Sequence, residues 1–423
     1  MEQAFIKANP DVWLMERAAM AVFNYISKHY DHHTDIAVLA GKGNNGGDGI
    51  LVAALLKKAQ YQVRIIHMAP LDQYRGDAKK ALDMALQYGV ECMPFSAGYM
   101  ADDQADLWLD ALLGIGFKAP LREPYREAII ALNQKEASVI ALDVPSGLAP
   151  DTGVVEDVAV SAALSISFIA DKFGFHTADG PDHVGQLFIE DLGVLQQDIR
   201  PCAHILNQQA LKQALPAKKQ NSHKHQFGHV LAIGGTAGML GALVLAAQGA
   251  FAAGAGLVTM ASCKGHAEAL AIHFPRAMSR AIESLDDCDS LFKEATVLVI
   301  GPGMDHSPWS KMVFEAAIAS DLPMVIDAGA LGLLAKRQAH KTIAQSIITP
   351  HPGEAASLLG TSSKEVQQDR LAALKGLSKW GEYVILKGQG SLLHAPNHIP
   401  RLCPYGGSDL AVAGSGDFLS GII

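Results

Sequence analysis

Residues 41–49 combine five glycines, two asparagines and an aspartate between an apolar run and a helical segment that starts at Ile50. Glycine tolerates positive φ and lets backbone N–H groups approach an anion closely, and the amino terminus of a following helix favours the same negative charge. We therefore predict a loop that wraps a phosphate-bearing ligand rather than a plain surface turn. The segment is not a P-loop, because no Gly-Lys-Ser/Thr follows, and it lacks the spacing of the dinucleotide fingerprint.

Three side chains with oxygen atoms, Asn45, Asp110 and Ser146, each follow a predicted strand. Oxygen ligands suit a hard cation such as potassium or magnesium, so the three could hold a metal ion. The alternative is that Asp110 and Asp143 only cap helices or turns. Asp143 ends an apolar run, where partial desolvation raises a carboxyl pKa, and it is the candidate for proton transfer.

In the second half, residues 414–417 read Gly-Ser-Gly-Asp and precede an apolar helical segment. Backbone amides at such a helix start can stabilise negative charge on a transferred phosphoryl group while Asp417 accepts a hydroxyl proton. The alternative is that Asp417 is an ordinary acidic residue favoured by the helix dipole. Three more loops, residues 301–303, 351–354 and 387–391, follow predicted strands and are expected to face a ligand.

Alternating strands and helices are expected to position these groups. In the first half we predict strands at 35–40, 62–67, 106–111, 138–143 and 164–169 and helices at 13–28, 50–59, 77–87 and 124–132. The alternation predicts an α/β fold with a parallel sheet covered on both faces. Ligands bind such sheets beyond the carboxyl ends of the strands, which is where the polar loops lie.

A second α/β series follows a polar connector. We predict strands at 228–233, 296–300, 324–327, 346–349 and 383–386 and a helix at 240–253. The expected organisation is a first domain at 1–200, a linker at 201–222 and a second domain at 223–423.

Composition limits the possible functions. A chain of 423 residues with 49% hydrophobic residues is long enough for two folded domains. A net charge of −9 without a basic block argues against nucleic acid as the main partner. The five cysteines show no paired spacing, and the sequence shows no signal peptide or membrane span, so we expect a cytoplasmic protein.

Taken in order, the motifs resemble those of the bifunctional NAD(P)H-hydrate repair enzyme family. They are Gly-Lys-Gly-Asn-Asn-Gly-Gly-Asp-Gly, Asp-Ala-Leu-Leu-Gly, Leu-Asp-Val-Pro-Ser-Gly-Leu, Gly-Pro-Gly, Thr-Pro-His-Pro-Gly-Glu and Gly-Ser-Gly-Asp. The resemblance covers nearly the whole chain, which looks clipped at both ends. It implies a Rossmann-like NAD(P)HX epimerase domain followed by a ribokinase-like, ADP-dependent NAD(P)HX dehydratase domain.

The resemblance also implies site residues in the epimerase half, where R and S NADHX or NADPHX would be interconverted. The implied potassium ligands are Asn45, Asp110 and Ser146. The implied substrate contacts are Asn44, Asn45, Gly46, Gly47, Asp48, Gly114, Ile115, Gly116, Phe117, Lys118, Ala119, Pro120 and Asp143.

In the dehydratase half, the resemblance implies that ADP, with or without magnesium, phosphorylates the hydroxyl of S-NAD(P)HX with Asp417 as base. Phosphate then leaves and the dihydronicotinamide is restored. The implied substrate contacts are Ala242, Gly303, His351 and Asp417, and the implied adenine-nucleotide contacts are Lys387, Gly388, Gln389, Gly390, Ser391 and Gly416. A homo-oligomer is also implied.

Some positions depart from the family pattern. Gly329 and Gly332 stand where an acidic and an amide side chain are usual, and Ile115 replaces a usual threonine. Three alternatives therefore stay open: an epimerase with a catalytically defective nucleotide-binding half, a ribokinase-like small-molecule kinase, and a metal hydrolase built on the histidine-rich residues 29–33.

Overall fold

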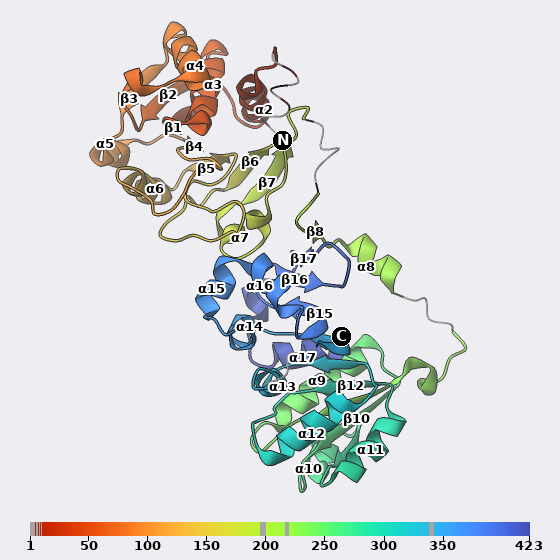
Figure 1. The fold of residues 1–423 in the computed structure, drawn as a ribbon. Helices are drawn as coiled ribbons and strands as arrows, with labels where there is room; N and C mark the ends of the chain where they lie inside the picture. Colours follow the sequence, from red (N-terminus) through yellow and green to blue (C-terminus); the bar gives the residue numbers. More distant parts are fainter. Residues whose placement is uncertain are drawn as a thin grey trace. The chain divides into compact units, whose positions relative to one another are not determined.

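The computed structural model describes residues 5, 7 and 9 and the ranges 11–194, 200–215, 220–337 and 342–423. The chain divides into two compact units, Met1–Arg200 and Pro201–Ile423 (Figure 1). Each unit is built around its own sheet, so each is described separately below.

Unit 1 contains a seven-stranded sheet in the order β3-β2-β1-β4-β5-β6-β7, and every neighbouring pair is parallel. The order reverses between β1 and β4, and the loops after the two strands at such a point are where ligands bind in sheets of this kind. The strands are β1 Asp35–Ala40, β2 Gln62–His67, β3 Glu91–Pro94, β4 Leu107–Ala111, β5 Ser138–Leu142, β6 Leu164–Phe168 and β7 Gln186–Glu190.

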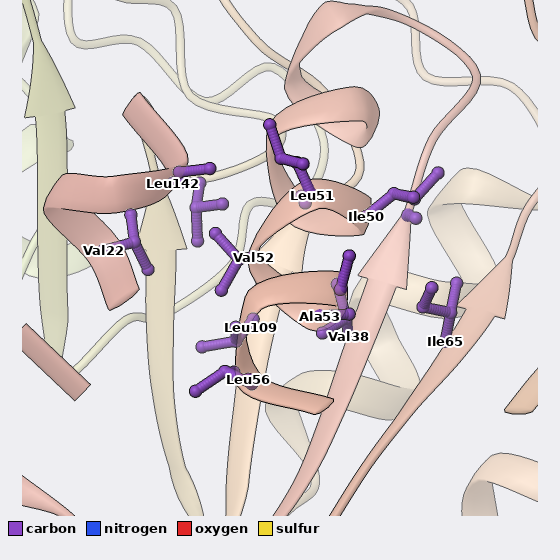
Figure 2. Packing of buried hydrophobic residues seen from close by; sticks show 14 of the residues in the cluster. Val22, Val38, Ile50, Leu51, Val52, Ala53, Leu56, Ile65, Leu109 and Leu142 are labelled. Carbon is purple, nitrogen blue, oxygen red and sulfur yellow. The ribbon is translucent and has the colours of Figure 1, made fainter. Parts of the chain in front are cut away.

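Helices cover both faces of this sheet, because alternate residues of the buried strands point to opposite sides. Val38 of β1 joins a core with α2, α3 and α4, whereas Leu39 joins a second core with α5 and α6. Figure 2 shows the first of these cores, with Leu51, Val52 and Leu56 of α3 among the strand side chains. The helices are α2 Leu14–His29, α3 Asn44–Lys58, α4 Gly76–Gln87, α5 Ala97–Asp102, α6 Tyr125–Asn133 and α7 Gly180–His183.

Unit 2 contains a ten-stranded sheet in the order β11-β10-β9-β12-β13-β14-β15-β16-β17-β8. Strands from β11 to β15 pair in parallel, β16 pairs antiparallel with both neighbours, and β8 pairs in parallel with β17. The strands are β8 His204–Ile205, β9 His229–Ile233, β10 Leu257–Ser262, β11 Met278–Ala281, β12 Val297–Ile300, β13 Met324–Ile326, β14 Ile343–Ile348, β15 Gly381–Leu386, β16 Ser391–His394 and β17 Arg401–Cys403.

Two helices of unit 2 approach each other backbone to backbone. A Cβ atom at Gly249 of α9 would lie 2.1 Å from the carbonyl oxygen of Phe418, and one at Gly421 of α17 would lie 1.8 Å from that of Ala246. Only glycine permits both approaches. The helices of this unit are α8 Gln208–Ala214, α9 Leu240–Ala253, α10 Ala267–His273, α11 Leu285–Glu294, α12 Pro308–Ala319, α13 Gly329–Leu334, α14 Pro352–Leu359, α15 Ser363–Gln368, α16 Arg370–Leu377 and α17 Ser415–Ile422.

The predicted α/β fold class, with a mainly parallel sheet in each half, is confirmed. Within the stretch expected to be a linker, residues 204–205 form β8 and extend the second sheet, and residues 216–219 lie outside the described residues. Among the described residues, no helix has the length and apolar character needed to cross a membrane.

Candidate active sites

Helix α3 begins at Asn44, so most of the segment predicted to be a loop forms the first turns of a helix instead. A Cβ atom at Gly46 would lie 1.7 Å from the carbonyl oxygen of Gly41, and one at Gly49 would lie 2.4 Å from Cβ of Ala111. No glycine in 41–49, all of which is described, has a positive φ. The loop prediction is therefore wrong from residue 44 onwards, because close packing of α3 on β1 and β4 is what requires the glycines.

The three predicted oxygen ligands converge at the switch point of the first sheet. Ser146 donates to the Asp110 carboxylate twice, from Oγ at 2.6 Å and from its backbone N–H at 2.8 Å. Asn45 donates from Nδ2 to the carbonyl oxygen of Leu113 at 2.8 Å, and the N–H of Leu113 donates to Ser146 Oγ at 2.9 Å. Asn45, Asp110 and Ser146 therefore belong to one hydrogen-bonded cluster.

Two features of this cluster suit a cation. Asp110 is fully buried, and burial raises the pKa of its carboxyl to about 6, although hydrogen bonds from Ser146 oppose the rise. Asn45 Oδ1 is buried, and within the described part of the chain it has no hydrogen-bond partner. A bare amide oxygen beside a buried carboxylate is a donor set for a hard cation, so the residues present fit potassium.

Asp143 follows β5 in a strained turn. Its φ is +63°, and the N–H of Val144 donates to the carbonyl oxygen of Leu142 across it at 2.8 Å. Its Oδ1 accepts hydrogen bonds from Lys172 Nζ at 2.7 Å and from the N–H of Phe168 at 3.2 Å. Positive φ at a residue other than glycine costs of order 1–3 kcal/mol and is most frequent at functional sites. This geometry is compatible with a role for Asp143 in proton transfer.

Lys172 contacts the candidate residue Asp143 and was not itself predicted from the sequence. Its ammonium group contacts Ser167 Oγ at 2.6 Å and the carbonyl oxygen of Phe168 at 3.0 Å, and its side chain is 15% exposed. It follows β6 at the same edge of the sheet as Asp110. The available signal was a basic residue in the loop after the strand predicted at 164–169, a loop that the sequence analysis did not examine.

The segment 114–120 follows β4 and joins the cluster only at its beginning. A Cβ atom at Gly114 would lie 3.1 Å from Cβ of Asn45. Ile115 is 57% exposed, and most of the remaining segment is also exposed. Asn44 is exposed at the start of α3 and Asp48 is half-buried one turn later. These predicted substrate contacts therefore surround the buried cluster rather than form it.

A pocket of about 310 Å³ lies at the carboxyl ends of β2 and β3. Its walls come from the segments 67–70 and 94–97, together with Pro124 and Glu127 at the start of α6. None of the predicted site residues lines this pocket, so it is separate from the cluster at Asp110.

In unit 2, Asp327 joins two segments that were predicted to bind a nucleotide. Its Oδ1 accepts from Lys387 Nζ at 2.8 Å, and its Oδ2 accepts from Ser420 Oγ at 2.5 Å. A Cβ atom at Gly416 would lie 3.3 Å from Lys387 Nζ, so the start of α17 packs against this lysine. Asp327 is 1% exposed and was not predicted as a site residue. Its signal was its position directly after a short apolar strand.

Asp417 is the third residue of α17, as expected for a residue at a helix start. Burial raises the pKa of its carboxyl, repulsion from Asp327 adds to the rise, and the charge of Lys387 opposes it. A carboxylate with a raised pKa is a stronger base than a free one, which suits a group that accepts a proton.

His351 and Glu354 lie at the start of α14, and Glu354 faces the same lysine. His351 Nδ1 accepts hydrogen bonds from the N–H groups of Gly353 at 3.0 Å and Glu354 at 3.3 Å, so in the neutral ring the proton is assigned to Nε2. Glu354 lies 3.9 Å from Lys387 Nζ, and burial raises the pKa of its carboxyl. Glu354 lies in the loop 351–354 that was expected to face a ligand, but it was given no role of its own.

The predicted substrate contacts Ala242 and Gly303 also lie together. A Cβ atom at Gly303, where φ is +65°, would lie 2.4 Å from the carbonyl oxygen of Met239 and 3.2 Å from Cβ of Ala242. Thr236 Oγ1 donates to the carbonyl oxygen of Gly303 at 3.0 Å. The loops after β9 and β12 therefore meet at the amino-terminal end of α9.

The loop 387–391 connects β15 to β16. The N–H of Lys387 donates to the carbonyl oxygen of Pro350 at 2.9 Å, and Ser391 Oγ donates to that of Gly388 at 3.0 Å. Arg370, which the sequence analysis did not single out, lies buried against this loop. The indication in the sequence was an arginine as the first residue of the mostly apolar segment 370–377.

The unusual glycines of α13 have close neighbours. A Cβ atom at Gly332 would lie 2.8 Å from Cε1 of His306, and one at Gly329 would lie 2.0 Å from the carbonyl oxygen of Met304. His306 and Met304 belong to the loop after β12, so this loop occupies the space that larger side chains at 329 and 332 would need. The two departures therefore fit their surroundings.

The structure does not support the metal hydrolase built on residues 29–33. His29 Nδ1 contacts the carbonyl oxygen of Tyr25 at 2.8 Å, His32 packs on Tyr61, and the N–H of His33 donates to Asp31. Across the described residues, no group of three or more His, Cys, Asp and Glu side chains could hold a metal ion. The cluster at Asp110 is of another kind, because two of its three candidate ligands are Asn and Ser.

Comparison with known proteins gives a match in each unit. Residues 12–174 match the family described as YjeF-related protein N-terminus, and residues 230–423 match the family described as NAD(P)H-hydrate dehydratase. A "Bifunctional NAD(P)H-hydrate repair enzyme Nnr" from Coxiella burnetii is 37% identical over 97% of this chain and 84% of its own length. The protein of the same name from Escherichia coli is 34% identical over 97% of this chain and 79% of its own length.

A similar solved structure is that of an ADP/ATP-dependent NAD(P)H-hydrate dehydratase from Bacillus subtilis, co-crystallised with ATP and Mg²⁺. It is 27% identical, covers 52% of this chain and 79% of its own, and has a TM-score of 0.47.

Proposed function

The chain belongs to the family of bifunctional NAD(P)H-hydrate repair enzymes, and from that premise we propose which residues of each unit perform its reaction. Unit 1 epimerises R and S NAD(P)HX, and unit 2 dehydrates the S epimer to NAD(P)H. Each unit matches a family of this enzyme, which does not favour a small-molecule kinase or a chain with one catalytically inactive unit.

In unit 1, Asn45, Asp110 and Ser146 hold a potassium ion. The observation that carries this proposal is the buried Asn45 Oδ1, which has no hydrogen-bond partner among the described residues and belongs to the same hydrogen-bonded cluster as the fully buried Asp110. A potassium ion bound there would supply a fixed positive charge close to the substrate. The segments 44–48 and 114–120 bind the rest of the nucleotide at the rim.

Asp143 takes up and returns a proton while one bond to the hydroxyl-bearing carbon breaks and re-forms on the opposite face, which inverts the configuration there. Lys172 orients the Asp143 carboxylate through the 2.7 Å contact and stabilises its negative charge. The strained turn at Asp143 fixes the side chain at the carboxyl end of β5, where the substrate would lie.

In unit 2, the hydroxyl oxygen of the substrate attacks the terminal phosphoryl group of ADP, and Asp417 accepts the proton of that hydroxyl. The phosphorylated hydrate then loses phosphate, so the products are NAD(P)H, AMP and phosphate. The segment 387–391 and Gly416 bind ADP, whereas Ala242, Gly303 and His351 contact the hydrate. Magnesium bound with ADP would neutralise part of the phosphate charge.

Two broader features also belong to the proposal. The five cysteines have free thiols, which suits the reducing cytoplasm. The homo-oligomer that the family resemblance implies can be tested by sedimentation of the purified chain.

The proposal is tested with a mixture of R and S NADPHX, following recovery of the dihydronicotinamide absorbance with and without ADP and potassium. Full conversion to NADPH only when ADP is present is the expected result, with a slower final phase when potassium is replaced by a larger organic cation. Equilibration of the epimers without any NADPH would contradict the dehydratase half.

A further inference from the structure

Arg370, the first residue of α16, is buried against the loop to which we assign ADP. The residue is 1% exposed. Its Nη2 lies 3.3 Å from the carbonyl oxygens of Leu386 and Lys387 and 3.4 Å from that of Gly390. Nη1 donates to Gln367 Oε1 at 2.6 Å. One guanidinium group therefore contacts the backbone at both ends of the loop, and α16 packs on β15 and β16 that flank it (Figure 1).

The loop bends around the guanidinium group at Gly388. Its φ is +133°, a backbone conformation that residues with side chains rarely adopt. A Cβ atom there would lie 2.8 Å from Nη1 and 3.2 Å from Nη2 of Arg370. The backbone of the loop therefore lies directly on the arginine, with no room for a side chain between them.

These contacts determine which way the peptide groups of the loop face. In a trans peptide the C=O and the following N–H point in opposite directions. Because the carbonyl group of Lys387 points toward Arg370, the N–H of Gly388 points away from it. Outward N–H groups of a glycine-rich loop are what phosphate oxygens bind, so the arginine sets the side of the loop that an anion would meet.

A simple packing role does not explain an arginine at this position. Its contacts within the described chain are to amide oxygens, and its Nε is buried there without a partner. Burial lowers the pKa of the guanidinium to about 10, so it is still charged at neutral pH. Burying a charge without a carboxylate partner costs free energy that an apolar side chain would not cost.

We propose that Arg370 is a positioning residue that holds the 387–391 loop in the shape that receives the phosphate groups of ADP. This inference rests on the proposed binding of ADP by that loop. Lysine cannot take over the role, because a point charge on a flexible chain lacks the planar fork that reaches several carbonyl groups at once.

The test uses the full chain with Arg370→Lys and Arg370→Met, assayed with S-NADPHX and varied ADP. We expect the KM for ADP to rise more than about tenfold in both variants, because the loop is no longer pre-organised, while the KM for NADPHX stays unchanged. Epimerase activity, measured on the same molecules, controls for the amount of folded protein. Arg337→Lys, at an arginine of the same unit that pairs with Glu315 at 3.4 Å, is the matched control.

A second measurement does not depend on ADP. Hydrogen exchange of the amides of 388–391 should become faster in Arg370→Lys, while exchange in β9 and β12 stays unchanged. Gly388→Ala should reproduce the effect, because its Cβ atom would displace the guanidinium group. The double variant should then show less than the sum of the two single effects, since both act on one contact.

A wild-type KM for ADP together with unchanged loop exchange in Arg370→Lys would overturn the inference. So would an equal loss of dehydratase activity and thermal stability with an unchanged KM for ADP, which indicates a structural role only. If the wild-type chain shows no dependence on ADP but the loop still exchanges faster in Arg370→Lys, the assignment of ADP fails and the role of Arg370 in shaping the loop stands.

Discussion

Burial raises the carboxyl pKa of Asp110 in unit 1 and of Asp417 in unit 2. The groups around the two carboxylates differ. Asp110 is surrounded by donors from Ser146 and Leu112, whereas Asp417 faces the charges of Asp327 and Lys387. The first environment fixes both carboxylate oxygens in place, as a cation ligand requires. The second leaves a carboxyl group whose proton affinity depends on nearby charges, as a general base requires.

Replacing Asp417 with asparagine should remove dehydratase activity and leave epimerase activity intact. Asparagine keeps the size of the side chain at the start of α17 but cannot accept the hydroxyl proton, so the rate should fall by about 10²–10⁴-fold, the usual contribution of a general base. The measurement is NADPH recovery with saturating ADP. A decrease of less than tenfold would mean that another group takes the proton.

Replacing Asp327 with asparagine should shift the acidic limb of the dehydratase pH profile to lower pH. The negative charge of Asp327 raises the pKa of Asp417, so its removal lowers that pKa and leaves the base ionised at lower pH. Release of Lys387 from its pair acts in the same direction. The measurement is kcat against pH at saturating ADP and NADPHX.

Asp287→Asn is the control for this variant, because Asp287 accepts hydrogen bonds from Ser284 at the start of α11, an element that carries none of the proposed site residues. An unchanged limb in Asp327→Asn, or a shift to higher pH, would show that Asp417 is not the group that titrates.

Site residues that belong to recognisable motifs could be predicted from the sequence. Residues that reach the site only through tertiary contacts could not. Asn45 and Ser146 follow strands and Asp110 lies near the end of one, so the topology of the sheet predicted that they meet. Lys172 and Arg370 act through contacts with residues far away in the sequence. No local pattern marks such a side chain, and only packing brings it to the site.

At the scale of elements, the position of α3 depends on glycines that bring its backbone against two strands. Gly46 lies over the carbonyl oxygen of Gly41, and Gly49 lies over Ala111. The same turns of the helix carry Asn45 into the cluster at Asp110. A shift of α3 by a few tenths of an ångström would therefore move a proposed potassium ligand.

Gly46→Ala should destabilise unit 1 and weaken epimerase activity. A Cβ atom 1.7 Å from a backbone oxygen forces the helix to move, and overpacking of this kind costs about 1–3 kcal/mol. Hydrogen exchange of the amides of β1 and α3 measures the loss locally. Gly43→Ala is the matched control, because a Cβ atom there would have nothing within 4 Å.

Equal exchange in the Gly46→Ala and Gly43→Ala variants would contradict the packing role of Gly46. Dehydratase activity should be unchanged in both, since α3 belongs to unit 1.

In unit 1 the long elements could be predicted from apolar runs and helical periodicity, and β1, β2 and, in unit 2, α9 match their predicted bounds. In unit 2, β10, α11 and α12 were not predicted. The edge strands β3 and β7 were missed, because they are short and partly exposed, which weakens the apolar signal. The start of α3 was placed too late because glycine and asparagine are typical of turns. Tertiary packing outweighed that preference.

At the scale of the whole molecule, the two reactions act in sequence on one pool of hydrate. Unit 2 consumes only the S epimer, so unit 1 determines whether the R epimer can be repaired. The two sheets have separate cores, and each proposed site is built within one unit. Damage to one site should therefore leave the chemistry of the other unchanged.

With Asp143→Asn, NADPH recovery from a mixed hydrate should stop when the S epimer is used up, and continue only at the rate of spontaneous epimerisation. Adding the Asp417→Asn chain, whose unit 1 is unaltered, should restore full conversion in trans. The measurement is the amplitude of the fast phase of NADPH formation. Complete fast conversion by Asp143→Asn alone would show that Asp143 is not needed for epimerisation.

The glycine contact between α9 and α17 has a consequence for how the protein is made. Gly249 packs on the backbone of Phe418, so the helix that carries Asp417 can dock only after the ribosome has added that distant segment. Unit 1 is complete at residue 200, which at about 5–20 residues per second precedes Asp417 by roughly ten to forty seconds. During that interval a nascent chain could already interconvert the epimers, well before it can dehydrate either of them.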